Sequence, residues 1–202
     1  FVFSWLLLFM LLTAGSVVQT LNLSGFYQKS VPASGGTFSE GIMGSFTNAN
    51  PLYATGSVDS AAARLVFSSL FTYDQKNNLV GDLVEKWSVD DRGIKYTFTL
   101  KEGIKWHNGK PLTAEDIVFT YKTIQNPDAK SPFFSSWQGI KIEAANERTV
   151  VFTLPNVLSS FPYALTNSIV PKHIIEQVPV GQLRTTRLNR VDPVGSGPFK
   201  WE

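Results

Sequence analysis

The sequence contains no cysteine in its 202 residues. This absence excludes disulfide bonds, thiolate metal sites, cysteine nucleophiles and a lipidated cysteine within this chain. Histidine is almost as scarce, and its two copies, His107 and His173, do not have the spacing of a metal-binding pair. We therefore expect no metal site and no cofactor, and a structural role for both histidines.

An excess of charge of one sign is also missing. The net charge is +2, and the 18 lysines and arginines are scattered along the chain rather than clustered. Binding to nucleic acid normally requires a basic patch or stripe, so we expect no nucleic-acid partner. The hydrophobic share of 43% is typical of a globular protein with a substantial core.

The first 18 residues, FVFSWLLLFMLLTAGSVV, carry no charge, and the first charged residue is Lys29. A helix of this length would span about 27 Å, close to the hydrocarbon thickness of a bilayer. A core helix would normally show a polar face, and this segment has none. We predict that residues 1–21 are a signal peptide or an uncleaved membrane anchor, and that residues 22–36 form a polar linker. The small residues at 14–16 would permit cleavage, so both outcomes stay open, and either one places the remainder outside the cytoplasm, in the periplasm or at the cell surface.

The motifs of common catalytic sites are absent as well. There is no G-x-S-x-G, and the glycine-rich VGSGPF lacks the Lys-Ser/Thr of a phosphate-binding loop. The adjacent acids Glu115 and Asp116 could act as an acid–base pair in an exported hydrolase. However, neighbours on a helix point about 100° apart, and Thr113 with Asp116 has the pattern of a capping box. We favour the capping interpretation and expect that the protein is not an enzyme.

Hydrophobic periodicity predicts a mixture of strands and helices. The clearest strand is 94–100, in which apolar and polar residues alternate. Asn108-Gly109 predicts a tight turn, and a helix is expected to begin near Thr113. The other expected elements are a strand at 37–42, a helix at 60–71, a turn at 73–80, paired strands within 140–154, a short helix at 171–178 and a turn leading into a strand at 194–201.

Three stretches resemble, in order, one known family: NANPLYATGSVDSAAARLVFSSLFTYD (48–74), LVGDLVEKWSVDDRGIKYTFTLKEGIKWHNGKPLTAEDIVFTY (79–121) and DPVGSGPFKW (192–201). They resemble the extracellular solute-binding proteins of family 5, the oligopeptide-, dipeptide- and nickel-binding proteins of bacterial ABC importers. The pattern W-x-V-x-D-x-G-x-x-Y-T-F-x-L-x-x-G-x-K-W/F-H-x-G-x-P-x-T-A-x-D is matched from Trp87 to Asp116, and P-V-G-x-G-P-F/Y from Pro193 to Phe199. The resemblance covers about residues 37–202.

The resemblance implies an α/β fold of the periplasmic-binding-protein class, with two lobes that close on a ligand. It implies that 37–67 and 170–202 are parts of the first lobe and that 68–169 is an inserted domain. The sequence starts without Met and stops in what is predicted to be a strand, so we expect a fragment that lacks the second lobe. The implied partners are a peptide or other small solute and the subunits of an ABC permease, and we expect a monomer.

The resemblance also implies which residues contact the ligand. In peptide-binding relatives the segment after the Asn-Pro pair forms part of the ligand wall, which here is Thr55, Gly56, Ser57 and Val58. Some relatives have an acid at the position of Thr55, where it meets the amino terminus of the peptide, and this sequence departs from them. Phe133, the aromatic after Ser-Pro, is the other expected contact. The departure at Thr55 leaves another solute open, such as an oligosaccharide or a nickel chelate.

Overall fold

The computed structural model describes residues 2–27, 39 and 41–201. These residues form two compact units, Phe1–Gly41 and Ile42–Glu202.

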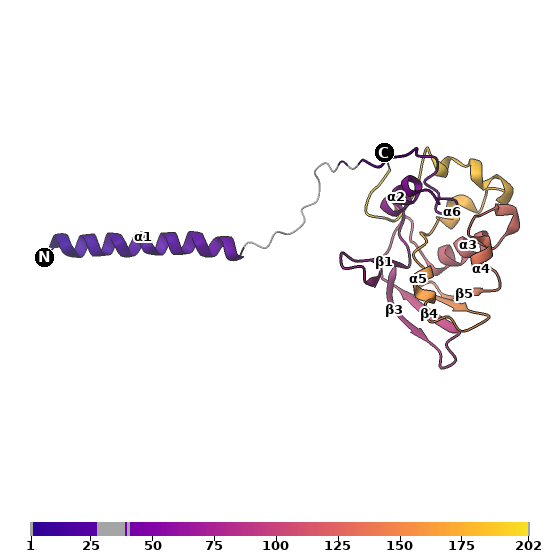
Figure 1. The fold of residues 1–202 in the computed structure, drawn as a ribbon, viewed down its shortest axis with the longest axis horizontal. Helices are drawn as coiled ribbons and strands as arrows, with labels where there is room; N and C mark the ends of the chain where they lie inside the picture. The colour runs from indigo at the N-terminus through magenta and orange to yellow at the C-terminus, as the bar shows by residue number, and fades with distance from the viewer. Residues whose placement is uncertain (1, 28–38, 40, 202) are drawn as a thin grey trace. The chain divides into compact units, whose positions relative to one another are not determined.

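The first unit contains a single long helix, α1 (Val2–Tyr27) (Figure 1). Its segment Val2–Thr20 is long and apolar enough to cross a membrane, and its side chains are exposed rather than packed against protein. Residues 22–27 are helical where we expected a linker. Residues 28–36 and most of the expected strand at 37–42 lie outside the described residues, and the described positions 39, 41 and 42 are not in a strand.

The second unit is built around a four-stranded antiparallel sheet with the order β3-β4-β6-β5. The strands are β3 (Val84–Val89), β4 (Lys95–Leu100), β5 (Lys141–Asn146) and β6 (Thr149–Thr153). Strand β4 buries alternate residues, as its sequence predicted, and its Phe98 lies opposite Val150 of β6. The expected paired strands within 140–154 are β5 and β6.

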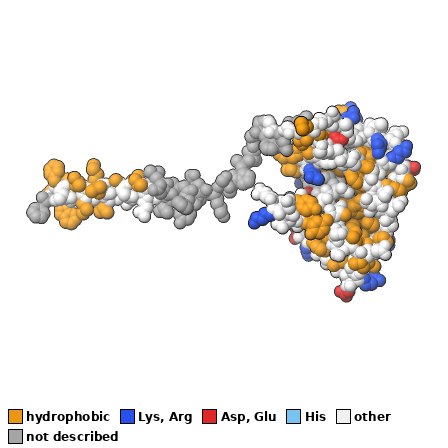
Figure 2. Space-filling model, in the orientation of Figure 1, with side chains coloured by type: hydrophobic (Ala, Val, Ile, Leu, Met, Phe, Trp, Pro, Cys, Tyr) orange, Lys and Arg blue, Asp and Glu red, His pale blue; other side chains and the backbone are white. Residues whose placement is uncertain are grey.

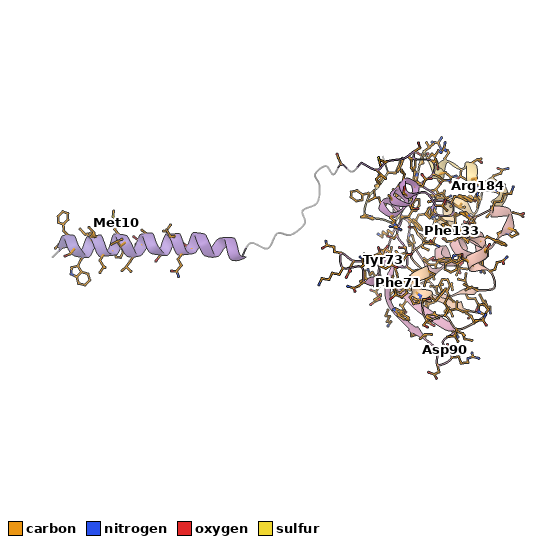
Figure 3. All side chains as sticks on the ribbon, viewed as in Figure 1. Met10, Phe71, Tyr73, Asp90, Phe133 and Arg184 are labelled. Atoms are coloured by element: carbon orange, nitrogen blue, oxygen red, sulfur yellow. The ribbon has the colours of Figure 1, made fainter. Side chains whose placement is uncertain are left out.

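A small hairpin and a helix precede the sheet. Strands β1 (Phe71–Tyr73) and β2 (Leu79–Gly81) are joined by the expected turn, in which Asn77 has a φ of 60°. Tyr73 extends from the body at the end of β1, whereas Phe71 is buried (Figure 3). Helix α2 (Ser57–Val66) ends well before residue 71. The predicted helix at 60–71 was therefore wrong at its carboxyl end, because residues 68 and 69 pair with the chain at 168 and 169 instead.

Helix α3 (Ala114–Ile124) packs against β5 and β6 (Figure 1). It begins with the predicted capping box of Thr113 and Asp116, and it buries Ile117, Tyr121 and Ile124. The remaining helices are short: α4 (Phe134–Trp137), α5 (Phe161–Ala164), α6 (Lys172–Ile175) and the 3-10 helices Pro127–Ala129, Val180–Thr185 and Arg187–Asn189. Helix α6 is the expected short helix after Pro171.

The segment at 194–201 corrects another prediction. It contains no strand, although we expected a turn leading into one. The N–H groups of Gly197 and Phe199 instead donate to the carbonyls of Val66 and Leu65, at 2.8 and 3.0 Å. These carbonyls belong to the last turn of α2, where carbonyls have no N–H donor within the helix. The segment therefore satisfies the end of the helix rather than extending a sheet.

Candidate ligand-binding site

The expected ligand wall leads directly into α2. Thr55, Gly56 and Ser57 are exposed, and Val58 is half-buried. The turn before them is fixed by Asn50, whose backbone carbonyl accepts from Ala54 N–H at 3.1 Å. Within the described part of the chain, neither the N–H nor the C=O of Thr55 has a hydrogen-bond partner. The backbone of Thr55 is thus free to pair with an extended ligand, whereas the Gly56 carbonyl already accepts from Ser60 N–H at 2.8 Å.

Asp59 holds the first turn of α2 in place. Its carboxylate accepts hydrogen bonds from the N–H of Thr47, at 2.7 Å, and from the Thr47 hydroxyl. Burial alone would raise the pKa of this carboxyl, but the hydrogen bonds from Thr47 and Asn48 outweigh it and hold the pKa below its usual range. Asp59 is therefore ionised and already fully engaged within the protein.

Two long-range hydrogen bonds bring Phe133 to the turn that precedes the wall. The Ser131 hydroxyl donates to the Leu52 carbonyl at 2.8 Å, and the Tyr53 hydroxyl donates to the Ala129 carbonyl at 2.9 Å. Phe133 lies two residues after Ser131 in the sequence and is half-buried (Figure 3). The structure thus places Phe133 near Leu52 and Tyr53, in the turn that leads into the segment 55–58.

A third segment, 166–168, closes the same region. It is held because Ile169 N–H donates to the Ser68 carbonyl at 2.8 Å and because Ser69 and Ser168 form an isolated bridge. Thr166 and Asn167 are half-buried, and Ser168 is buried. No pattern in the sequence marked this segment as part of the site.

Helix α2 with the turn before it, Phe133 and the segment 166–168 line a hollow of about 80 Å³, which we call the α2 hollow. It is lined by Pro51, Ala54, Ser60, Ala63, Arg64, Phe133 and the segment 166–168. Phe133 thus lines the α2 hollow, whereas Thr55 to Val58 do not: their neighbours Ala54 and Ser60 do. The sequence did not identify Arg64, because a single arginine on a helix carries no motif.

The acidic pair of α3 is not arranged as a catalytic pair. Glu115 is exposed, and its carboxylate pairs with Lys172 Nζ at 3.1 Å. Asp116 is buried and accepts the backbone N–H groups of Thr113 and Lys172, both at 2.9 Å. Burial raises the pKa of Asp116, and these two hydrogen bonds oppose that rise. Asp116 therefore caps α3 and also ties α6 to it.

Both histidines are engaged in structural contacts. The backbone N–H of His107 donates to the Gly195 carbonyl at 2.8 Å, and its Nε2 lies 2.9 Å from the Gly197 carbonyl oxygen. Asn108 Nδ2 donates to His173 Nε2 at 2.9 Å, which requires a neutral ring. The turn at Asn108-Gly109, where Gly109 has the expected positive φ of 85°, thus holds together segments from distant parts of the chain.

Hydrophobic side chains on the visible face of the second unit lie in several separate patches, with Lys and Arg toward the edges (Figure 2). Exposed aromatic residues include Tyr73, Trp87 and Tyr163. Trp87 stacks on Tyr96 across the edge of the sheet, with ring centroids 6.3 Å apart. These side chains are outside the α2 hollow.

Comparison with known proteins identifies relatives that bind small solutes. The family model described as "Bacterial extracellular solute-binding proteins, family 5 Middle" matches residues 78–202. The oligopeptide-binding protein AppA of Bacillus subtilis is 34% identical over 194 residues, which cover 95% of this chain and 36% of AppA.

Solved structures agree with the sequence comparison. AppA of Bacillus subtilis in complex with a nonapeptide is matched with a TM-score of 0.74 over 80% of this chain and 33% of that one. NikZ of Campylobacter jejuni in complex with Ni(L-His) is 30% identical, with a TM-score of 0.70 over 80% of this chain and 32% of NikZ. MoaA from A. tumefaciens R10 in complex with mannopinic acid is 28% identical, with a TM-score of 0.68 over 78% of this chain and 32% of MoaA. The chain spans about a third of the length of these relatives.

Proposed function

This chain belongs to the bacterial extracellular solute-binding proteins of family 5, and we propose that it is part of a receptor that captures peptides outside the cytoplasm for an ABC importer. Its mixed α/β structure is part of the periplasmic-binding-protein-like fold, as the sequence led us to expect. The family is a solute-binding component of transport rather than a family of enzymes.

One observation carries the peptide assignment: the backbone N–H and C=O of Thr55 are unpaired beside the α2 hollow. The N–H and C=O of Thr55 have no partner in the described residues, and the adjoining Ala54 and Ser60 line the α2 hollow with Phe133. An extended peptide can pair its main chain with such a segment, which gives affinity largely independent of side chains. Thr55, Gly56, Ser57, Val58 and Phe133 are the residues we propose as ligand contacts.

The two-lobe arrangement is part of the proposal. We assign 37–67 and 170–202 to the first lobe and 68–169 to an inserted domain. Contacts between the two first-lobe pieces support this division: Ala49 N–H donates to the Asn189 carbonyl at 2.7 Å, and Asn50 Nδ2 donates to Asn189 Oδ1 at 2.9 Å. Capture would then need a second lobe, which closes over the ligand about a hinge.

The N-terminal helix indicates where in the cell the protein would act. We propose that residues 1–21 direct export and either are cleaved or remain as an anchor in the cytoplasmic membrane. The segment Val2–Thr20 has the length and apolarity for both roles. The receptor would work as a monomer and deliver its solute to the permease subunits of the importer.

The alternative within the same role is a different solute. NikZ and MoaA are described with Ni(L-His) and mannopinic acid, and Thr55 leaves no carboxylate to meet a peptide amino terminus. An oligosaccharide would require aromatic stacking, for which Phe133 is the candidate in the α2 hollow.

The test is a thermal-shift panel on the protein expressed from its complete reading frame. We expect peptides of several lengths to raise the unfolding temperature in a concentration-dependent way. The comparison panel contains Ni(L-His), mannopinic acid and oligosaccharides. A shift with one of these and none with any peptide would reject peptide capture while preserving the transport role.

A further inference from the structure

Arg64 is the charged residue that lines the α2 hollow. It lies on α2 one turn after Ser60, and it is exposed. Within the part of the chain that the structure describes, its guanidinium takes part in no hydrogen bond and no ion pair. The guanidinium of Arg64 is therefore available to a ligand that enters the α2 hollow.

Two further donors in the α2 hollow are also unpaired. The Asn167 carboxamide and the Ser168 hydroxyl have no hydrogen-bond partner among the described residues. The unpaired polar atoms of these two side chains are not fully buried, so a ligand in the hollow can reach them. Other lining hydroxyls are already used: Ser60 Oγ donates to the Ala54 carbonyl and Thr166 Oγ1 to the Tyr163 carbonyl, at 3.4 and 3.3 Å.

Among the residues that the structure describes, no carboxylate lines the α2 hollow. Asp59, the acid on α2, is engaged elsewhere, because its carboxylate accepts from the N–H of Thr47 at 2.7 Å. Among the described lining residues, the unpaired polar groups are therefore one guanidinium, one amide and one hydroxyl, without a carboxylate beside them in the lining. This set of donors complements an anion.

We propose that the α2 hollow is the subsite for an anionic group of the bound solute, a carboxylate held by Arg64 with Asn167 and Ser168 as additional donors. The planar guanidinium can take both oxygens of a carboxylate at once, which a lysine cannot do. Phe133 forms the apolar side of the hollow, against which the carbon atoms next to the carboxylate would pack. The proposal rests on the proposed function, since the α2 hollow would bind one part of the same captured peptide.

A carboxylate on a peptide can come from an acidic side chain or from the carboxyl terminus. The experiment therefore uses two matched sets of peptides with the protein expressed from its complete reading frame. In one set a Glu is moved along an otherwise neutral sequence, and each member is paired with its Gln counterpart. In the other set the same neutral peptide has a free carboxyl terminus or a terminal amide.

Binding is measured by calorimetry for the wild type, Arg64→Gln, Arg64→Lys and the control Arg92→Gln. Arg92 lies in the turn between β3 and β4, outside the hollow, with its side chain 77% exposed. We expect the wild type to prefer one Glu peptide, or the free acid, by about tenfold, since charge-assisted hydrogen bonds are worth that much. Arg64→Gln should remove this preference without weakening the neutral peptides, Arg64→Lys should retain part of it, and Arg92→Gln should retain all of it.

Three results would overturn the subsite. Equal affinity of the wild type for both members of every pair would show that the α2 hollow does not select an anion, while peptide capture stands. Equal weakening of all peptides by Arg64→Gln would assign Arg64 to lobe closure instead. Failure of the wild type to bind any peptide would reject the proposed peptide function and this subsite together. Unchanged unfolding temperature of Arg64→Gln verifies that the variant is folded.

Discussion

Replacing Asp116 by alanine should destabilise the protein much more than the same change at the adjacent Glu115. The Asp116 side chain accepts two backbone N–H groups, from Thr113 and Lys172, at 2.9 Å each. Alanine would leave both donors unpaired, and each loss costs about 1–3 kcal/mol when water cannot replace the acceptor. Both donors are only partly buried, so we expect a loss of about 2–4 kcal/mol in the free energy of unfolding.

Replacing Glu115 by alanine should lower the free energy of unfolding much less. Its ion pair with Lys172 joins side chains that are 55% and 35% exposed, and such pairs contribute at most about 1 kcal/mol. Its position in the first turn of α3 adds a small favourable interaction with the helix dipole. Glu115→Ala should therefore cost about 1 kcal/mol or less, and Asp116→Asn, which keeps one acceptor oxygen, should fall between the two alanine variants.

Urea unfolding followed by tryptophan fluorescence gives these values directly. The capping interpretation is refuted if Glu115→Ala costs as much as Asp116→Ala, or if both cost less than about 0.5 kcal/mol. The same variants separate the transport role from the hydrolase alternative. Loss of a hydrolytic activity in either variant, with an unchanged free energy of unfolding, would assign the pair to catalysis.

Three further predictions concern a packed glycine, a histidine and the ligand wall. In Gly195→Ala the new Cβ would lie 1.7 Å from the carbonyl oxygen of Val66, so we expect a loss of about 3 kcal/mol or more in urea unfolding, against almost none for Gly181→Ala, where nothing lies within 4 Å. Burial lowers the pKa of His173 below 6.5, so at mildly acidic pH the unfolded chain binds a proton more readily than the folded chain. The free energy of unfolding should therefore fall as the pH drops below about 6.5, and His173→Gln should reduce that loss. Thr55→Glu should increase the affinity for peptides with a free amino terminus by about fivefold relative to their acetylated forms, and an equal change for both would contradict the proposed place of this residue in the wall.

Local chemistry allowed much of the second unit to be predicted. The alternation in 94–100 predicted β4, Asn108-Gly109 predicted a turn with a positive φ at Gly109, and Thr113 with Asp116 predicted the start of α3. Each of these features depends on interactions between residues close in sequence. That is why the pattern of a single chain was sufficient.

The errors occurred where distant segments meet. The helix predicted at 60–71 ends at Val66 because Ser68 and Ser69 pair with residues about a hundred positions later. The strand predicted at 194–201 is absent because Gly197 and Phe199 bond to the end of α2. Propensity within a window cannot register such partners, and tertiary contacts override it.

The residues that make the family recognisable are different from those that would select its solute. His107 contacts the carbonyls of Gly195 and Gly197, so the two patterns that carry the family resemblance, Trp87 to Asp116 and Pro193 to Phe199, meet in space and hold each other. Such contacts need specific geometry and therefore produce a readable pattern.

Arg64 and Asn167 belong to neither of these two patterns, because a solute subsite needs only that a few donors converge across the fold and stay unpaired. Two chains could share every element of the pattern and still differ in charge at the α2 hollow. For this reason the identity of the solute has to be sought in the unpaired groups that line the hollow, and the charge at position 64 is the first variable to test.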